Sequence, residues 1–162
     1  MYMKLLKFAQ DLVKTEQATM FKVNKFQVMH ASIALHKMKQ NKDTMNVMRP
    51  GSGKSFAILL IAAYLAKYEP QMKVAIVLLN ETLLEQIRIQ SNQFDIPKVN
   101  FRLYKELSKG ENFDVVLYDE YYHHVRIFKL MFGTDGKLEA PFNFHNMGKR
   151  RMLFGGHSDS QF

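Results

Sequence analysis

The fold is decided by the segment TMNVMRPGSGKSFAILL at residues 44–60, where a short apolar run passes through Gly-Ser-Gly-Lys-Ser into a second apolar run. Gly51 and Gly53 allow a tight turn that brings backbone N–H groups against an anion, and a helix beginning there points its positive dipole end at the same place. Lys54 adds a positive charge, and the Ser55 hydroxyl suits Mg²⁺, which prefers oxygen ligands. The segment predicts a Walker A loop that binds the phosphates of a nucleoside triphosphate through Pro50, Gly51, Ser52, Gly53, Lys54 and Ser55.

A pair of carboxylates follows another apolar run, FDVVLYDE at residues 113–120. At a strand tip beside a phosphate loop, Asp119 can hold Mg²⁺ through a water molecule, and Glu120 can orient and deprotonate the attacking water. The alternative is that Asp-Glu only opens the next helix, where negative charge suits the helix dipole. The upstream loop favours a Walker B pair, in which Ser55 and Asp119 hold the metal while Glu120 and Lys54 take part in catalysis.

Short apolar strands alternate with helices along the chain, which is the pattern of a parallel sheet. Strands are expected near residues 44–48, 73–79, 99–103, 113–118 and 151–154. Helices are expected over residues 2–17, 26–38, 53–67 and 81–94, with a short one through Leu107 and another beginning near Tyr121. Residues 132–148 lack periodicity and predict an irregular segment, followed by a solvated turn at Lys149, Arg150 and Arg151 before the last strand.

The predicted fold is α/β, with a parallel sheet of about five strands covered by helices on both faces. In such sheets ligands bind beyond the carboxyl ends of the strands, and both motifs follow such an end. We expect residues 1–22 to form an N-terminal helical extension and residues 23–162 to form a single nucleotide-binding domain.

Composition and charge narrow the classes of function. The 162 residues suit one domain with a buried core, and the absence of cysteine excludes disulfides, thiolate metal sites and cysteine nucleophiles. Residues 1–54 contain ten Lys or Arg against three Asp or Glu, and residues 55–162 contain thirteen against twelve. The basic N-terminal part of the sequence could attract polyanions such as nucleic acid, or it could be a solvated surface.

The longest apolar run, residues 56–66, is too short to span a bilayer. We therefore expect a soluble protein of the cytoplasm, the nucleus or a virus, with no membrane partner.

With both motifs in place, the chain from about Phe26 onward resembles the first RecA-like lobe of superfamily 2 helicases and translocases, including the DEAD-like and restriction-endonuclease motor families. The resemblance implies that Gln27, in KFQVMHA, recognises adenine, and Met48 stands where the family's loop has a small residue. VAIVLLNETLLEQ (residues 74–86) and RLYKEL (residues 102–107) are similar to the segments that contact the nucleic-acid backbone. The contacts implied are Asn80, Thr82, Arg102 and Lys105.

The resemblance also implies ATP and Mg²⁺ as cofactors and DNA or RNA as a partner. Members of this family hydrolyse ATP with help from an arginine of a second RecA-like lobe, so hydrolysis here is expected to need such a lobe or another protein subunit. Two alternatives remain. Arg49 and the run Asp119-Glu120-Tyr121 also resemble a viral DNA-packaging ATPase of the terminase type, and the lack of a second lobe favours a non-catalytic ATP-binding assembly subunit.

Overall fold

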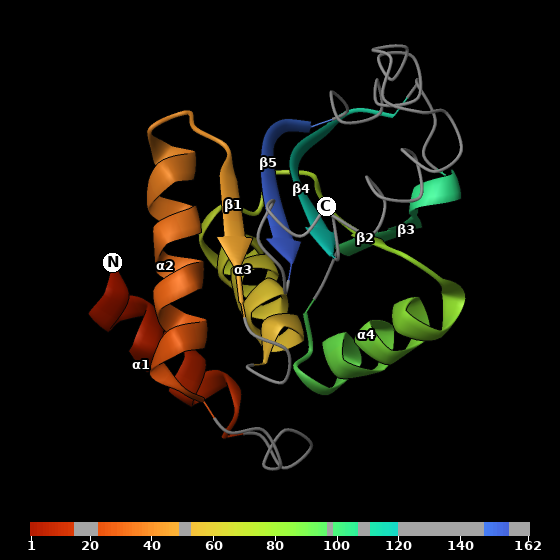
Figure 1. Cartoon of the computed structure of the whole chain (residues 1–162). Helices are drawn as coiled ribbons and strands as arrows, with labels where there is room; N and C mark the ends of the chain where they lie inside the picture. Colours follow the sequence, from red (N-terminus) through yellow and green to blue (C-terminus); the bar gives the residue numbers. More distant parts are fainter. Residues whose placement is uncertain (15–22, 49–52, 97–98, 107–110, 120–147, 156–162) are drawn as a thin grey trace.

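A sheet of five parallel strands forms the centre of the described part of the protein (Figure 1). The computed structural model describes residues 1–14, 23–48, 53–96, 99–106, 111–119 and 148–155. Its strands in chain order are β1 (Thr44–Val47), β2 (Val74–Leu78), β3 (Val99–Leu103), β4 (Phe113–Asp119) and β5 (Gly148–Gly155). Across the sheet the order is β1-β5-β4-β2-β3, so β5 lies between the two strands that precede the predicted motifs. The prediction of a five-stranded parallel α/β sheet is confirmed.

The helices of the described residues pack together over one face of the sheet. They are α1 (Tyr2–Leu12), α2 (Lys25–Lys39), α3 (Lys54–Tyr68) and α4 (Glu81–Gln93), and a short 3-10 helix, η2 (Tyr104–Glu106), follows β3. α3 lies between α2 and α4, and α1 packs against α2 and α3 (Figure 1). Side chains on the opposite face, such as Ala75, Val77, Val116 and Tyr118, are buried as well. The helix predicted near Tyr121 lies outside the described residues.

Each helix has the composition that its surroundings require. α3 is apolar on all sides, and every residue from Phe56 to Leu65 is buried, because the sheet, α2 and α4 share one core with it. α1 is amphipathic: Leu5 and Ala9 are fully buried, and the Phe8 ring meets the Tyr64 ring edge to face at 5.7 Å. No helix in the described ranges combines the length and the apolar character needed to cross a membrane.

Two boundaries predicted from the sequence are wrong. The first helix was expected to reach residue 17 but ends at Leu12, and the side chain of Val13 still packs against the core. The turn expected at Lys149 and Arg150 is instead part of β5, which begins at Gly148 because it pairs with β4 from the first residue of that strand.

Asp114 joins three segments at the amino-terminal end of the sheet. Its Oδ2 accepts a hydrogen bond of 2.8 Å from the backbone N–H of Lys73, and its Oδ1 lies 3.3 Å from Lys149 Nζ. The hydrogen bond from the Lys73 N–H is the main cause that lowers the pKa of the Asp114 carboxyl below its ordinary value. The Lys149 ammonium also lowers this pKa, and partial burial opposes the shift. The folded state therefore favours ionised Asp114.

We predict that Asp114→Asn flattens the dependence of stability on acid pH. A carboxyl whose pKa is lower in the folded state stabilises fully above its unfolded pKa of about 4, and this contribution disappears as pH falls through the folded value. Unfolding by urea, followed at neutral pH and at several values below pH ~4, should show a smaller loss of unfolding free energy in the variant than in the wild type. If the unfolding free energies of the wild type and the variant fell equally with pH, this would contradict the lowered pKa of Asp114.

Candidate functional site

The two predicted motifs meet at the carboxyl-terminal edge of the sheet. Phe154 of β5 pairs with Asn46 of β1 on one side and with Asp119 of β4 on the other, so the ends of β1 and β4 lie at the same level. The backbone N–H of Met48 continues this row with a bond of 2.8 Å to the carbonyl of Gly155. The segment after β1 and the carboxylate that ends β4 therefore share one edge.

Lys54 and Asp119 form an ion pair at this edge. Lys54 Nζ lies 3.2 Å from Asp119 Oδ1, and the two side chains are 15% and 7% exposed. Lys54 is the first residue of α3, so the carboxylate also faces the positive end of that helix dipole. Removing one member of such a buried pair leaves an uncompensated charge, at a cost of about 3 kcal/mol or more. Sequence reasoning named both residues, and the fold brings them into contact.

Gly53 occupies a position that favours glycine. It is the N-cap of α3 with a φ of 84°, in the left-handed region, and its carbonyl accepts the backbone N–H of Ala57 at 3.1 Å. A Cβ at this position would clash with Gln27 Nε2 unless that side chain moved. Both the backbone conformation and the close approach of Gln27 therefore disfavour a side chain here.

Gln27 connects the start of α2 with the start of α3. Its Oε1 accepts from the backbone N–H of Asn24, while Asn24 Oδ1 accepts from the backbone N–H of Gln27, which forms a capping box. Its Nε2 donates to the carbonyl of Gly53 at 3.3 Å, and only 4% of the residue is exposed. The amide thus holds the start of α3 against the start of α2.

Of the other residues in and around the predicted loop, the structure describes Ser55 and Met48. Ser55 lies in the first turn of α3, directly after Lys54 in the chain, and is partly exposed. Met48 is 2% exposed and belongs to the hydrophobic core, which explains why a large apolar side chain stands there. Pro50, Gly51, Ser52 and Glu120 lie outside the described residues.

The predicted nucleic-acid contacts follow β2 and β3. Asn80 and Thr82 are exposed, and Asn80 Oδ1 caps α4 by accepting the backbone N–H of Leu83 at 3.0 Å. The Lys105 side chain is outside what the structure describes.

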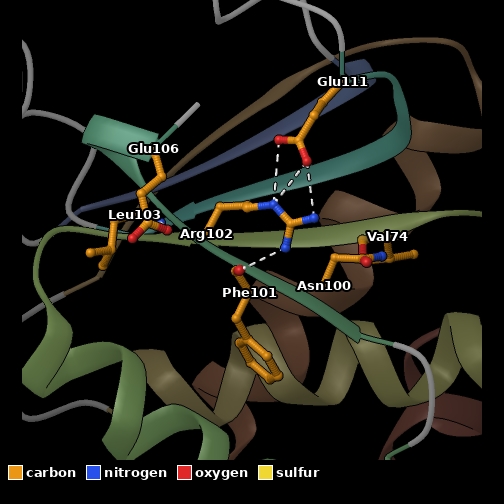
Figure 2. Close-up of polar contacts among 7 residues, drawn as sticks. All are labelled: Val74, Asn100, Phe101, Arg102, Leu103, Glu106 and Glu111. Carbon is orange, nitrogen blue, oxygen red and sulfur yellow. Dashed lines mark hydrogen bonds and ion pairs between the residues drawn. The ribbon is translucent and has the colours of Figure 1, made fainter. Parts of the chain in front are cut away.

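Arg102 belongs to the same group but is engaged within the protein. Figure 2 shows its guanidinium directed at Glu111, with Nη2 3.0 Å from Glu111 Oε1 and Nε at the same distance from that oxygen. Its Nη1 donates to the carbonyl of Phe101, and the group lies 5.8 Å from the centre of the Phe113 ring. Arg102 therefore lies along the sheet and braces β3 against the start of β4.

Tyr104 is a buried residue beside Asp119 that sequence reasoning did not single out. Its hydroxyl donates a hydrogen bond of 2.9 Å to the backbone carbonyl of Asp119, and its ring stacks on Tyr118 at 6.0 Å. No local spacing relates Tyr104 to the acidic pair, so no pattern in the sequence could have revealed this contact.

Together, the sheet and the residues at its edge define a RecA-like lobe of the helicase type. Residues 11–114, more than half of the chain, match the family described as type III restriction enzyme, res subunit. The chain belongs to this family, as the resemblance to superfamily 2 motors predicted. No curated protein matches it.

Solved structures share the fold at low identity. The SWI2/SNF2 ATPase core of Sulfolobus solfataricus, in complex with dsDNA, aligns with a TM-score of 0.62 and 14% identity over 85% of this chain and 32% of its own. The type ISP restriction-modification enzyme LlaGI, in complex with a DNA substrate mimic, aligns with a TM-score of 0.60 and 18% identity over 85% of this chain and 18% of its own. The UvsW helicase of bacteriophage T4 aligns with a TM-score of 0.57 and 15% identity over 93% of this chain and 59% of its own. The chain thus spans only part of the length of each of these proteins.

We predict that Gly53→Ala destabilises the protein by about 1 kcal/mol from the left-handed backbone alone, and by more because Gln27 must move. The double variant Gln27→Ala/Gly53→Ala separates the two effects, since it removes the side chain that the new Cβ would meet. Urea unfolding of the wild type, both single variants and the double variant should give a double variant that loses less than the sum of the singles. Additive losses would show that Gln27 does not restrict position 53.

Proposed function

We propose that this chain is the ATP- and Mg²⁺-binding first lobe of a helicase-like, nucleic-acid-dependent ATPase. The observation that carries the proposal is the Lys54–Asp119 ion pair at the N-terminal end of α3. At this ion pair, a cation that can bind phosphate and a carboxylate that can bind a metal lie beside a helix end that favours anions. The family membership supports the same function.

The described residues fit a magnesium nucleotide. Lys54 would exchange part of its contact with Asp119 for phosphate oxygens, and Ser55 and Asp119 would hold Mg²⁺, with a water molecule between the metal and Asp119. The bound metal supplies charge neutralisation at the phosphates. Glu120 would orient and deprotonate the attacking water, and Pro50, Gly51, Ser52 and Gly53 would complete the loop.

Gln27 has two tasks in this proposal. Its hydrogen bond to the carbonyl of Gly53 supports the loop, and recognition of adenine would require its amide to exchange one of its bonds to the protein backbone for the base. Recognition of adenine would thus be coupled to the position of Gly53.

Nucleic acid would contact the same edge, at the segments after β2 and β3. Exposed Asn80 and Thr82 support a contact after β2, and we propose further contacts by Arg102, near the end of β3, and by Lys105, after it. Arg102 would exchange Glu111 for a phosphate group. A second RecA-like lobe, in the same protein or in a partner, would complete the machinery for hydrolysis. No described feature favours the packaging ATPase or the assembly subunit over this function.

We predict that Lys54→Ala weakens binding of ATP with Mg²⁺ at least about tenfold, or about 1.4 kcal/mol, because the phosphates lose their cation. Isothermal titration calorimetry of the full chain measures this effect. Lys14→Ala is the matched control, since that side chain is 75% exposed and its ion partner among the described residues is Asp11, three positions earlier. Asp119→Asn, which leaves Lys54 in place, should reduce the gain in affinity that Mg²⁺ provides. Equal affinity in wild type and Lys54→Ala would refute the proposed function.

We predict that Glu111→Gln strengthens binding to a single-stranded oligonucleotide, because Arg102 is then released for a phosphate. One additional phosphate contact should steepen the salt dependence of log K by about 0.7. Fluorescence anisotropy at several salt concentrations measures both quantities. Asp43→Asn is the control, because it removes the same charge from another carboxylate–arginine pair, with Arg151, before β1. If both variants gain the same affinity for the oligonucleotide, the effect comes from net charge alone and Arg102 does not contact the phosphates.

A further inference from the structure

The hydroxyl of Tyr104 holds the backbone at the point where the acidic pair begins. It donates to the carbonyl of Asp119, the atom of the peptide group that joins Asp119 to Glu120. The pairing of β2 with β4 ends at Val77↔Tyr118, one residue earlier. The Tyr104 side chain thus provides a donor to β4 just beyond the point where its pairing with β2 ends.

The surroundings of this bond are largely withdrawn from water. Tyr104, Tyr118 and Asp119 are 6%, 0% and 5% exposed, and the two tyrosine rings stack with an angle of 28° between their planes. Because water has little access here, it cannot readily replace the Tyr104 hydroxyl as a donor to the Asp119 carbonyl. The ring stack directs the hydroxyl at this carbonyl.

Asp119 is therefore held at both ends. Its side chain pairs with Lys54 at the start of α3, and its backbone carbonyl is bound by Tyr104 in η2. η2 directly follows β3, and Glu106 closes this turn by accepting the backbone N–H of Leu103 at 3.4 Å (Figure 2). A displacement of the segment after β3 is thus transmitted through one hydrogen bond to the residue that faces Lys54.

We propose that Tyr104 is a positioning residue that couples nucleic-acid binding after β3 to magnesium-nucleotide binding at Asp119. This inference rests on the proposed function and adds to it a physical connection between the two ligands. Each ligand, by ordering its own side of the Tyr104–Asp119 bond, raises the affinity for the other by the same factor.

The test is the coupling between the two ligands, measured on the full chain. The affinity for a non-hydrolysable ATP analogue with Mg²⁺ is determined by calorimetry with and without saturating single-stranded DNA, and again with RNA of the same sequence. Tyr104→Phe removes the hydroxyl and keeps the ring that stacks on Tyr118. Tyr64→Phe is the matched control, because it removes another buried tyrosine hydroxyl, on α3, whose ring packs against Phe8 and Tyr68.

We expect the better polymer to raise nucleotide affinity about fivefold or more in the wild type and in Tyr64→Phe. In Tyr104→Phe this factor should fall to about one, while the affinity for each ligand alone changes less than about threefold. Thermal unfolding confirms that both variants are folded.

The possible failures are distinguishable. A wild type that binds no magnesium nucleotide refutes the proposed function itself. A wild type that binds both ligands independently overturns the coupling through Tyr104 alone, as does a factor that Tyr104→Phe leaves unchanged. Equal loss of coupling in Tyr64→Phe would show a general effect of the core, which also overturns the inference.

Discussion

The contact between Lys54 and Asp119 is the interaction on which the carboxyl-terminal edge of the sheet depends. Both side chains are largely withdrawn from water, so each charge needs the other for compensation. The contact can form only if the start of α3 lies beside the end of β4. Insertion of β5 between β1 and β4 sets the spacing of those two strand ends. The ion pair therefore links the order of the strands to the chemistry at their ends.

Two further hydrogen bonds secure the same edge from opposite sides. On the side of α2, Gln27 bonds the carbonyl of Gly53 and is itself fixed by the capping box with Asn24. On the side of β3, Tyr104 bonds the carbonyl of Asp119. These side chains bond the backbone carbonyls of Gly53, at the start of α3, and of Asp119, at the end of β4. The helix caps and the ring stack thus hold the backbone that presents the charged groups.

The ion pair between Arg102 and Glu111 shows that a basic residue in a recognisable segment can already be engaged within the protein. Arg102 lies in a stretch that resembles a nucleic-acid contact, yet its guanidinium is satisfied by Glu111 and by the carbonyl of Phe101. The surplus of positive charge in residues 1–54 likewise includes Lys54, whose charge Asp119 offsets. Net charge therefore overstates the charge free to attract a polyanion.

The sequence by itself determined the α/β class, the positions of most strands and helices, and the location of Lys54 and Asp119 at one edge of the sheet. These follow from local periodicity, and from the rule that ligands bind where parallel strands end. Only the tertiary structure decided that β5 lies between β1 and β4, that Arg102 turns to Glu111, and that Tyr104 reaches Asp119. Each of these depends on a contact between different structural elements, which no spacing within a single element encodes.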